Sequence, residues 1–332
     1  LTGIWVSKFE AAYATSGEVP NKAPVKESSV VYTSANVWAP VIEAQGVNLG
    51  ITEQTNIPAR NWLDGVYEAN KEKIKYPTFQ GSSYAMNYIT INDANNISRA
   101  ITEEGNIYGL SSNDADSHLM KNSEWGACTY LARSAKYGIG NRDIAVNNKN
   151  LDNGGTSNTQ AQGNTKASAY AVTGYNSNNN EWNDYLGSNL SSSTTGNIYG
   201  IYDMSGGGWE RTASYINNGN TGNGSSVAVG KDRSTKYATV YPHSDVGNTD
   251  DEKSAANYKL NDKIYGDSVR ETSTEGKGST SWYGDYSYFP EGGYPFFGRG
   301  GDYGNGSSAG LSAFHRSNGG AGCSNGFRSV LV

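Results

Sequence analysis

The spacing of apolar residues predicts a first short helix over Asn92–Ile101. Ala94, Ile97 and Ile101 recur at intervals of three and four residues, which places them on one face of a helix. Thr90 or Asn92 can cap its N-terminus, because a short polar side chain accepts a hydrogen bond from the first turn. We expect this helix to turn its apolar face toward a core.

A second and clearer pattern predicts a helix over Ser123–Ser134. Asn122 is a suitable N-cap, and Glu124 in the first turn complements the helix dipole. Cys128 and Leu131 then lie on one face. Small sulfur side chains on such faces are usually buried free thiols. We therefore expect Cys128 to be buried and free, although a disulfide with the distant Cys323 stays open.

Short apolar runs separated by polar turns predict strands along the rest of the chain. They cover Ile4–Phe9, Val30–Tyr32, Val41–Ile42, Val47–Leu49, Ile198–Met204, Tyr237–Tyr241 and Tyr286–Phe289. Two helices among scattered strands indicate an α+β fold with long loops rather than a doubly wound sheet. No internal repeat or linker divides the chain, so we expect a single domain over residues 1–332.

Two polar stretches interrupt this pattern. Residues 147–197 and 217–229 consist mainly of Asn, Gly, Ser and Thr, with few apolar anchors. Such segments bury too little apolar surface to fold alone. We expect residues 147–197 to form a surface insertion over a core built elsewhere.

Composition narrows the possible surroundings and partners. The net charge is −6 with no basic stripe, which argues against a nucleic-acid partner. A neutral polar surface and 24 tyrosines fit an extracellular, cell-surface or virion protein.

No apolar run reaches the roughly 18 residues of a membrane span. The chain begins inside a predicted strand, so we expect a preceding segment that supplies any membrane anchor.

The C-terminal segment Gly298–Val332 has the most distinctive pattern. Arg299-Gly300-Gly301 and Gly326-Phe327-Arg328 enclose a run of small polar residues with isolated aromatic and basic side chains. Closely spaced glycines indicate irregular loops rather than a helix. These are either plain turns or recognition loops, and loops on a rigid scaffold are where proteins usually keep recognition.

Five segments in order carry a family resemblance. They are Gly3–Glu10 (GIWVSKFE), Lys121–Ala127 (KNSEWGA), Gly200–Glu210 (GIYDMSGGGWE), Arg299-Gly300-Gly301 and Gly326-Phe327-Arg328. Together they resemble the C-type lectin fold of the formylglycine-generating-enzyme type. The resemblance spans nearly the whole chain and implies an α+β fold with two short helices, short strands, long loops and insertions.

The residues of these motifs have physical roles that fit a scaffold. Trp209 is suited to the core, and Glu210 is suited to hold backbone groups or an arginine. Arg299 and Arg328 stand in apolar surroundings, where a guanidinium needs a carboxylate or carbonyl partner. The candidate carboxylates are Glu124, Asp203 and Glu210.

The sequence does not show the chemistry of the family's enzymes. The oxidase members use two neighbouring cysteines, whereas Cys128 and Cys323 are far apart here. The three histidines, His118, His243 and His315, lack the spacing of metal ligands. We therefore expect no catalytic residues, no metal and no cofactor.

A second branch with this fold comprises the variable proteins of diversity-generating retroelements, found on phage tips and bacterial surfaces. In that branch the segment between the two C-terminal motifs is rewritten at adenines, which cannot produce Lys, Glu, Gln, Trp or Met from an asparagine codon. These five types make up 47 of the 332 residues, and about five would be expected in Gly298–Val332, but none occurs there.

The resemblance therefore implies a displayed ligand-binding protein that is not an enzyme, with a hypervariable C-terminal face. Its partner would be a protein or glycan on another cell, a phage or a host. Aromatic, arginine and small polar side chains would supply the contacts. The expected binding residues are Asp302, Tyr303, Asn305, Ser312, Phe314, His315, Arg316, Ser317, Asn318, Ser324 and Asn325. Phe314 could equally pack inward beneath the site.

Two other functions remain open from the sequence. The first is a thiol oxidase of the formylglycine-generating type that uses Cys323 as its nucleophile. The second is a calcium-dependent carbohydrate adhesin, although no cluster with calcium-ligand spacing stands out.

Overall fold

The structure of the chain is a computed structural model. It describes residues 3–13, 77–79, 85–86, 89–104, 106, 108–147, 190–197, 199–228, 236–244, 246–322 and 324–332. The strands expected at 30–32, 41–42 and 47–49, most of the 147–197 insertion, and Cys323 lie outside these residues.

The largest sheet is built around strand β5 (Trp209–Ile216), every residue of which is buried. The other strands are β6 (Thr239–Tyr241), β7 (Phe296–Arg299), β8 (Phe314–Ser317) and β9 (Asn325–Phe327). Along one edge, β5 pairs in parallel first with β9 and then with β6. Along its other edge, β5 pairs antiparallel with β7, which in turn pairs with β8. The strands of the C-terminal segment are thus fixed to a buried central strand.

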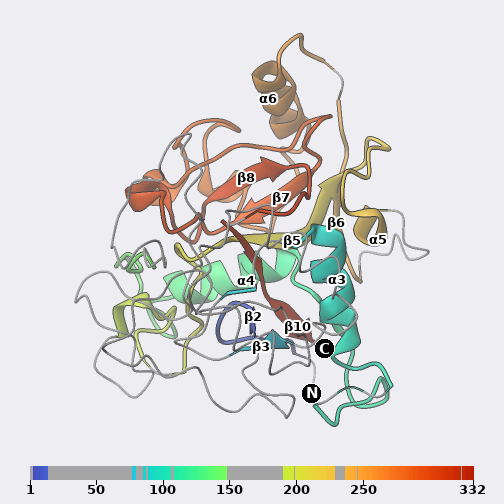
Figure 1. Ribbon diagram of the computed structural model, residues 1–332. Coiled ribbons are helices and arrows are strands. Elements are labelled where there is room, and N and C mark those ends of the chain that lie inside the picture. Colours follow the sequence, from blue (N-terminus) through green and yellow to red (C-terminus); the bar gives the residue numbers. More distant parts are fainter. Residues whose placement is uncertain are drawn as a thin grey trace, which may run out of the picture.

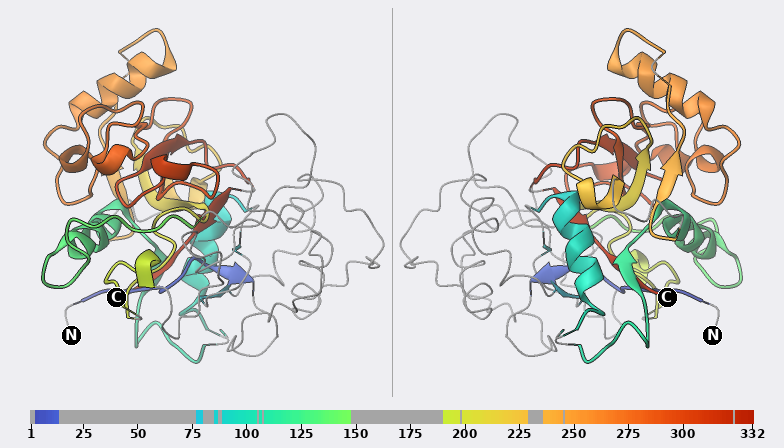
Figure 2. Two further views of the ribbon diagram at one scale, coloured as in Figure 1. Left: turned by 90° about the vertical axis from the view of Figure 1, so that its left-hand side faces the viewer. Right: turned by 90° about the vertical axis from the view of Figure 1, so that its right-hand side faces the viewer.

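A smaller antiparallel sheet brings distant parts of the chain together. Its order is β1 (Trp5–Val6), β10 (Ser329–Leu331) and β4 (Ser117–Leu119), and a separate pair is formed by β2 (Ala12–Tyr13) and β3 (Pro77–Thr78). Trp5 pairs with Leu331 and Val6 with Val330. The first and last strands therefore lie side by side, at the opposite end of the molecule from helix α6 (Asp250–Leu260) (Figure 2).

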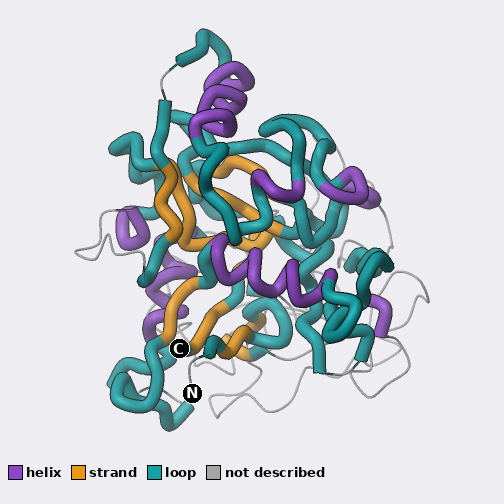
Figure 3. Tube along the Cα trace, turned by 180° about the vertical axis from the view of Figure 1, so that it is seen from behind, coloured by secondary structure: helices purple, strands orange, loops and turns teal. Residues whose placement is uncertain are grey.

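The helices flank these sheets. They are α3 (Ile91–Ala100), α4 (Asn122–Arg133), α5 (Ser225–Ala228) and α6, with short 3₁₀ turns η1 (Leu190–Ser192), η2 (Arg270–Thr272), η3 (Trp282–Gly284) and η4 (Gly306–Ser308). Figure 1 shows α4 below β5 and α3 at its side, with β7 and β8 above. From behind, α4 crosses the middle of the molecule (Figure 3). The expected α+β class is confirmed.

Both predicted helices are present within one residue of their expected bounds. Thr90 caps α3 by accepting a hydrogen bond from the backbone of Asp93 at 3.1 Å. The expected cap of α4 was wrong, because Lys121 occupies that position and Asn122 begins the helix. The Asn122 side chain is buried instead and donates to the Tyr241 hydroxyl at 3.0 Å.

Two further helices, α5 and α6, were missed by the sequence pattern. In α6 the buried side chains are Ser254, Asn257 and Tyr258, so the helix has no apolar stripe to detect. Its start does have a signal, because Thr249 and Glu252 form a reciprocal capping box. The capping residues, rather than periodicity, could have predicted this helix.

The strand predictions were partly wrong. Strands β1 and β6 fall inside the expected runs, but Tyr286–Phe289 contributes only one isolated bridge, between Ser287 and Phe314. Residues 201–204 are irregular, and Asp203 adopts a φ of 64°. The longest described strand, β5, was not predicted because its sequence WERTASYI carries buried polar residues where alternation would require apolar ones.

Two apolar clusters form much of the core in the described part of the chain. One packs Trp125, Cys128 and Ala132 of α4 against Leu311 and Val330 near the C-terminus, and the Trp125 indole donates to the Leu311 carbonyl at 2.8 Å. The other gathers aromatic side chains on one face of the large sheet, including Tyr241, Phe289, Phe297 and Phe314. Cys128 is a buried free thiol, as predicted.

A buried ion pair joins the last strands to β5. Arg328 and Glu210 are 0% and 1% exposed, and the Arg328 Nε donates to Glu210 Oε2 at 2.7 Å while Nη2 bonds to Oε1. The remaining donors of Arg328 reach the carbonyls of Ser7 and Tyr202, each at 2.8 Å. One guanidinium thus ties four separate parts of the chain together, and the predicted role of Glu210 is confirmed.

Arg299 is buried as well, but it is satisfied without a carboxylate at hydrogen-bond distance. Its guanidinium donates to the carbonyls of Ala313, Asp267 and Ser268 at 2.9–3.0 Å. Glu124, another expected partner, instead bonds His118 Nε2 at 2.9 Å and the backbone of Lys121. The two arginine motifs therefore hold the fold through different chemistry.

We predict that Glu210→Gln lowers the free energy of unfolding by about 3–5 kcal/mol, because it leaves the Arg328 charge buried without its counterion. Urea unfolding followed by circular dichroism measures this. Asp116→Asn, which removes a partly exposed carboxylate that also pairs with cations, serves as the control and should cost about 1 kcal/mol or less. Equal losses for the two variants would contradict the prediction.

Candidate ligand-binding site

A cavity of about 290 Å³ opens on the C-terminal segment. It is lined by Trp209, Tyr294, Asp302, His315, Arg316, Ser317, Asn318, Gly320, Ala321, Ser324 and Asn325. We call it the C-terminal cavity. Seven of the eleven binding residues expected from the sequence line it, namely Asp302, His315, Arg316, Ser317, Asn318, Ser324 and Asn325.

The other four expected residues do not line this cavity. Ser312 and Phe314 are completely buried, and Tyr303 is 4% exposed and packs against Ala85. The Asn305 side chain accepts from the backbone of Asp302 at 2.7 Å and so holds its own loop. Ser312, Tyr303 and Phe314 therefore support the loops instead of contacting a ligand, with Phe314 in the inward position that the sequence left open. Asn305 is half-buried, and its role in binding stays a prediction.

His315 lies against the indole of Trp209 at the base of the cavity. Their ring centroids are 4.1 Å apart, and the planes are inclined by 32°. Burial, together with the nearby charge of Arg211, lowers the pKa of His315 to about 3. The imidazole is therefore neutral at physiological pH and acts as a packed aromatic surface.

Gly298 on β7 makes room for this stack. A Cβ atom on Gly298 would lie 2.2 Å from His315 Nε2, which is far inside contact distance. Gly298 pairs with His315 across the β7–β8 ladder, so the two positions share one face of the sheet. The absence of a side chain at Gly298 thus decides where the imidazole sits.

Arg316 is positioned by side chains outside the C-terminal segment. Its Nη1 donates to Ser254 Oγ on α6 at 2.9 Å, and Asp251 lies 3.7 Å from Nη2. The guanidinium also lies over the rings of Tyr288 and Tyr294, at 4.7 and 5.6 Å from their centroids. Helix α6, which was not predicted, therefore helps to fix a cavity-lining cation.

Beneath the cavity lies the buried Arg211 of β5, which is 2% exposed. Its Nη1 donates to Ser317 Oγ at 3.3 Å, and its Nη2 donates to the Gly320 carbonyl. Its Nε has no partner, and within the described part of the chain no carboxylate lies within ion-pair distance of it. Burial lowers the pKa of Arg211 to about 10, so it stays charged at neutral pH.

Asp302 is the acidic group of the cavity lining. One carboxylate oxygen accepts from the backbone of Gly304 at 2.9 Å. Burial raises the pKa of Asp302 to about 6, although this backbone bond and a bond from Ser324 act in the opposite direction. Above that pH the carboxylate adds a negative charge to a site whose other charged groups are positive.

Sequence reasoning missed several contributors to this site. Trp209 was expected only in the core, and Tyr294, Gly320 and Ala321 were not singled out. Arg211 follows the recognised Trp-Glu motif directly but has no motif signal of its own. Strand alternation from Trp209 would place Arg211 on the same face, which is the only hint that the sequence offers.

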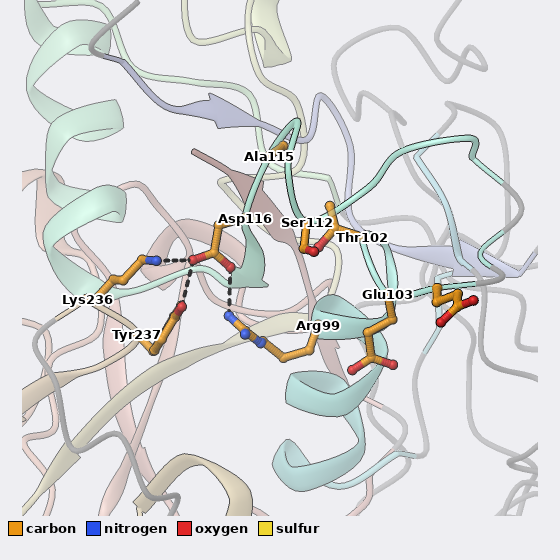
Figure 4. Close-up of a pocket in the computed structure, with 9 residues that line it drawn as sticks. Arg99, Thr102, Glu103, Ser112, Ala115, Asp116, Lys236 and Tyr237 are labelled. Carbon is orange, nitrogen blue, oxygen red and sulfur yellow. Dashed lines mark hydrogen bonds and ion pairs between the residues drawn. The ribbon is translucent and has the colours of Figure 1, made fainter.

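A second polar cavity, of about 420 Å³, lies near α3 and is shown in Figure 4. Arg99 at 2.8 Å, the Tyr237 hydroxyl at 2.7 Å and the Lys236 ammonium all bond to the carboxylate of Asp116. Burial alone would raise the pKa of Asp116, but the bonds from Lys236 and Tyr237 hold it below its ordinary value. The charges of Arg99, Asp116 and Lys236 in this second cavity are thus paired with one another.

The described residues hold no group of three or more His, Cys, Asp or Glu side chains arranged to bind a metal. His118 is buried and bonds Glu124, and His315 packs on Trp209.

No described helix combines the length and the apolar character needed to cross a bilayer. A comparison with models of protein families and with curated proteins finds no match for this sequence.

A buried carboxyl group supports the loop before β8. Asp285 is 1% exposed, and its Oδ2 accepts from the Ser312 backbone at 2.9 Å. Burial raises the pKa of Asp285 to about 8. The carboxyl is therefore largely protonated at neutral pH, beneath the chain that leads into the cavity.

We predict that Gly298→Ala displaces the His315 imidazole from Trp209, because the new methyl group would overlap it. The ring-current shift of the His315 imidazole protons, measured by NMR, should shrink. Gly292→Ala is the matched control, since its Cβ would meet only Asn218, at 3.7 Å. Unchanged His315 shifts in Gly298→Ala would show that the stack is not set by this contact.

We predict that Asp285→Asn makes stability less dependent on pH. Burial raises the folded-state pKa of Asp285 to about 8 from its ordinary value of 3.8. The stability that Asp285 contributes is therefore complete below pH 3.8 and is lost as the pH rises toward 8, by at most about 1.4 kcal/mol per pH unit. Thermal melts at pH 5 and pH 8 should differ less for Asp285→Asn than for the wild type. Equal differences would contradict this.

Proposed function

We propose that this chain is a ligand-binding protein without enzymatic activity, and that its C-terminal cavity is the binding site. The observation that carries the proposal is that seven residues selected from sequence alone line one cavity. They come from three places, the turn after β7, strand β8 with the residue that follows it, and the start of β9 with the residue before it. Side chains from three segments converge as expected for a recognition site on a rigid scaffold.

The division between buried and accessible positions supports a variable face. Arg299, Phe314 and Arg328 are completely buried and hold the C-terminal strands to the core. Asn318 is exposed, and Arg316, Ser317, Ser324 and Asn325 are half-buried around the cavity. Substitution at the second group changes what a ligand meets and leaves the buried contacts in place.

We further propose that the α+β fold is a C-type lectin fold of the formylglycine-generating-enzyme type, diversified by a retroelement. The proposal is supported by the order of the five motifs, by the burial of Trp125 in an apolar cluster and by the buried pair of Glu210 and Arg328. It is also supported by the lack of Lys, Glu, Gln, Trp and Met in Gly298–Val332. The protein would be displayed on a cell or virion and bind a protein or glycan there.

The DNA around the coding region tests the retroelement. We expect a reverse-transcriptase gene and a near-copy of the 3′ end that differs only opposite adenines. The differing codons should include Arg316 and Asn318 and should spare Arg299, Phe314 and Arg328, because the last three are buried. If the differences fall on the buried codons, or if no near-copy exists, this origin is wrong.

We predict that substitutions on the cavity wall leave folding intact. Asn318→Tyr should change the free energy of unfolding by no more than about 1 kcal/mol, since the side chain is exposed. Phe314→Ser should cost about 3–5 kcal/mol, because it empties a buried aromatic site. Urea unfolding separates the two cases, and similar losses would show that the cavity wall is part of the core.

Binding is tested with labelled full-length protein on glycan arrays and on bacterial and host cells. Any ligand found should be lost with Asn318→Tyr and kept with Arg99→Gln, which alters the other cavity. A ligand that is indifferent to every cavity substitution would refute the proposed site.

A further inference from the structure

The C-terminal cavity combines a buried cation with a set of hydrogen-bond donors. Arg211 lies under the floor formed by Ser317 and Gly320, and no carboxylate pairs with it among the described residues. A buried charge without a counterion is costly, and a bound anion would offset that cost. Arg316 adds a second positive charge at the wall, which Asp251 offsets only in part at 3.7 Å.

The neutral side chains of the wall also present donors. Ser317 Oγ already accepts from Arg211 at 3.3 Å and from the Gly319 backbone at 3.1 Å, so its own proton remains to donate. Asn318 Oδ1 accepts from the Gly320 backbone at 2.8 Å, which leaves the amide of Asn318 to donate. A carboxylate is an acceptor-only group and matches such a wall.

The shape of the site favours a sugar over a peptide. The cavity of about 290 Å³ is at the small end of ligand pockets, and Tyr294, which is 41% exposed, lines it. An added peptide strand would need the outer edge of β8. That edge is already occupied at Phe314, which accepts from the Tyr288 backbone and donates to the Tyr286 carbonyl, each at 2.9 Å.

We infer that the C-terminal cavity binds the carboxylate of an acidic monosaccharide unit, such as a sialic or uronic acid at a glycan terminus. The inference rests on the proposed function and names its ligand class. Arg316, Ser317 and Asn318 would contact the carboxylate, with the charge of Arg211 beneath. Asp302 is the one acidic side chain in the lining and would oppose binding while ionised.

The test is saturation-transfer NMR with the full chain at pH 7.5, using N-acetylneuraminic acid and glucuronic acid as probes. Glucose and N-acetylglucosamine are the neutral controls, and a short Glu-rich peptide is the alternative anion. We expect the acidic sugars to bind at least tenfold more tightly than the neutral ones. Tight peptide binding without sugar binding, or equal binding of neutral sugars, would overturn the inference.

Three variants make the test independent of folding losses. Arg316→Gln should weaken acidic-sugar binding at least tenfold, and Arg99→Gln in the other cavity should leave it unchanged. Asp302→Asn should strengthen binding severalfold, because it removes the opposing charge and keeps an oxygen acceptor for Gly304. A gain in affinity for the acidic sugar cannot come from misfolding of the variant. If Asp302→Asn and Arg316→Gln change binding in the same direction, the charge argument is wrong.

The outcomes also separate this inference from the proposed function. If a ligand from the arrays or cells depends on Asn318 but no acidic sugar binds, the ligand class is wrong and the binding face stands. If cavity substitutions change the binding of neither acidic sugars nor any other ligand, then both the ligand class and the proposed binding site are wrong.

Discussion

The buried pair of Arg328 and Glu210 is the contact on which the rest of the C-terminal architecture depends. The guanidinium satisfies both oxygens of one carboxylate and two backbone carbonyls, so the chain near Ser7, Tyr202, β5 and the final strands must meet at one point. Such a pair contributes little net stability against an apolar alternative, but a single broken partner is costly. Its effect is to allow one arrangement of these segments.

That constraint explains how a segment rich in glycine can hold a defined cavity. Strands β7 and β9 are fixed on opposite edges of the buried β5, and Arg299 fixes the turn after β7 through three carbonyls. The loops between them need few internal contacts of their own. The same arrangement leaves Arg211 beneath these loops, so a feature of the central strand sets the charge of a surface that later strands build.

The sequence predicted the parts of the molecule where local pattern and tertiary role agree. Helices α3 and α4 have apolar faces and were found, and the cavity wall of β8 was found because polar residues between fixed motifs are unusual. Strand β5 was missed because its buried positions include Glu210 and Arg211, whose burial depends on partners more than 100 residues away. Helix α6 was missed for the related reason that it buries amides and hydroxyls. Ser312 lies in the turn before β8 and is buried by tertiary contacts, and Phe314 took the inward one of its two open positions because register decides which face of a short strand is accessible.

The neighbouring positions of β1 and β10 have a practical consequence for how the molecule can be held. Strands β1 and β10 lie on the same side of the fold, away from β8, which lies in the upper part of Figure 1. A tether at either end would hold the molecule on the side away from β8, which contributes three residues to the cavity lining. On the proposed function, many copies on one support would engage a clustered target together, so that weak individual contacts add up through avidity.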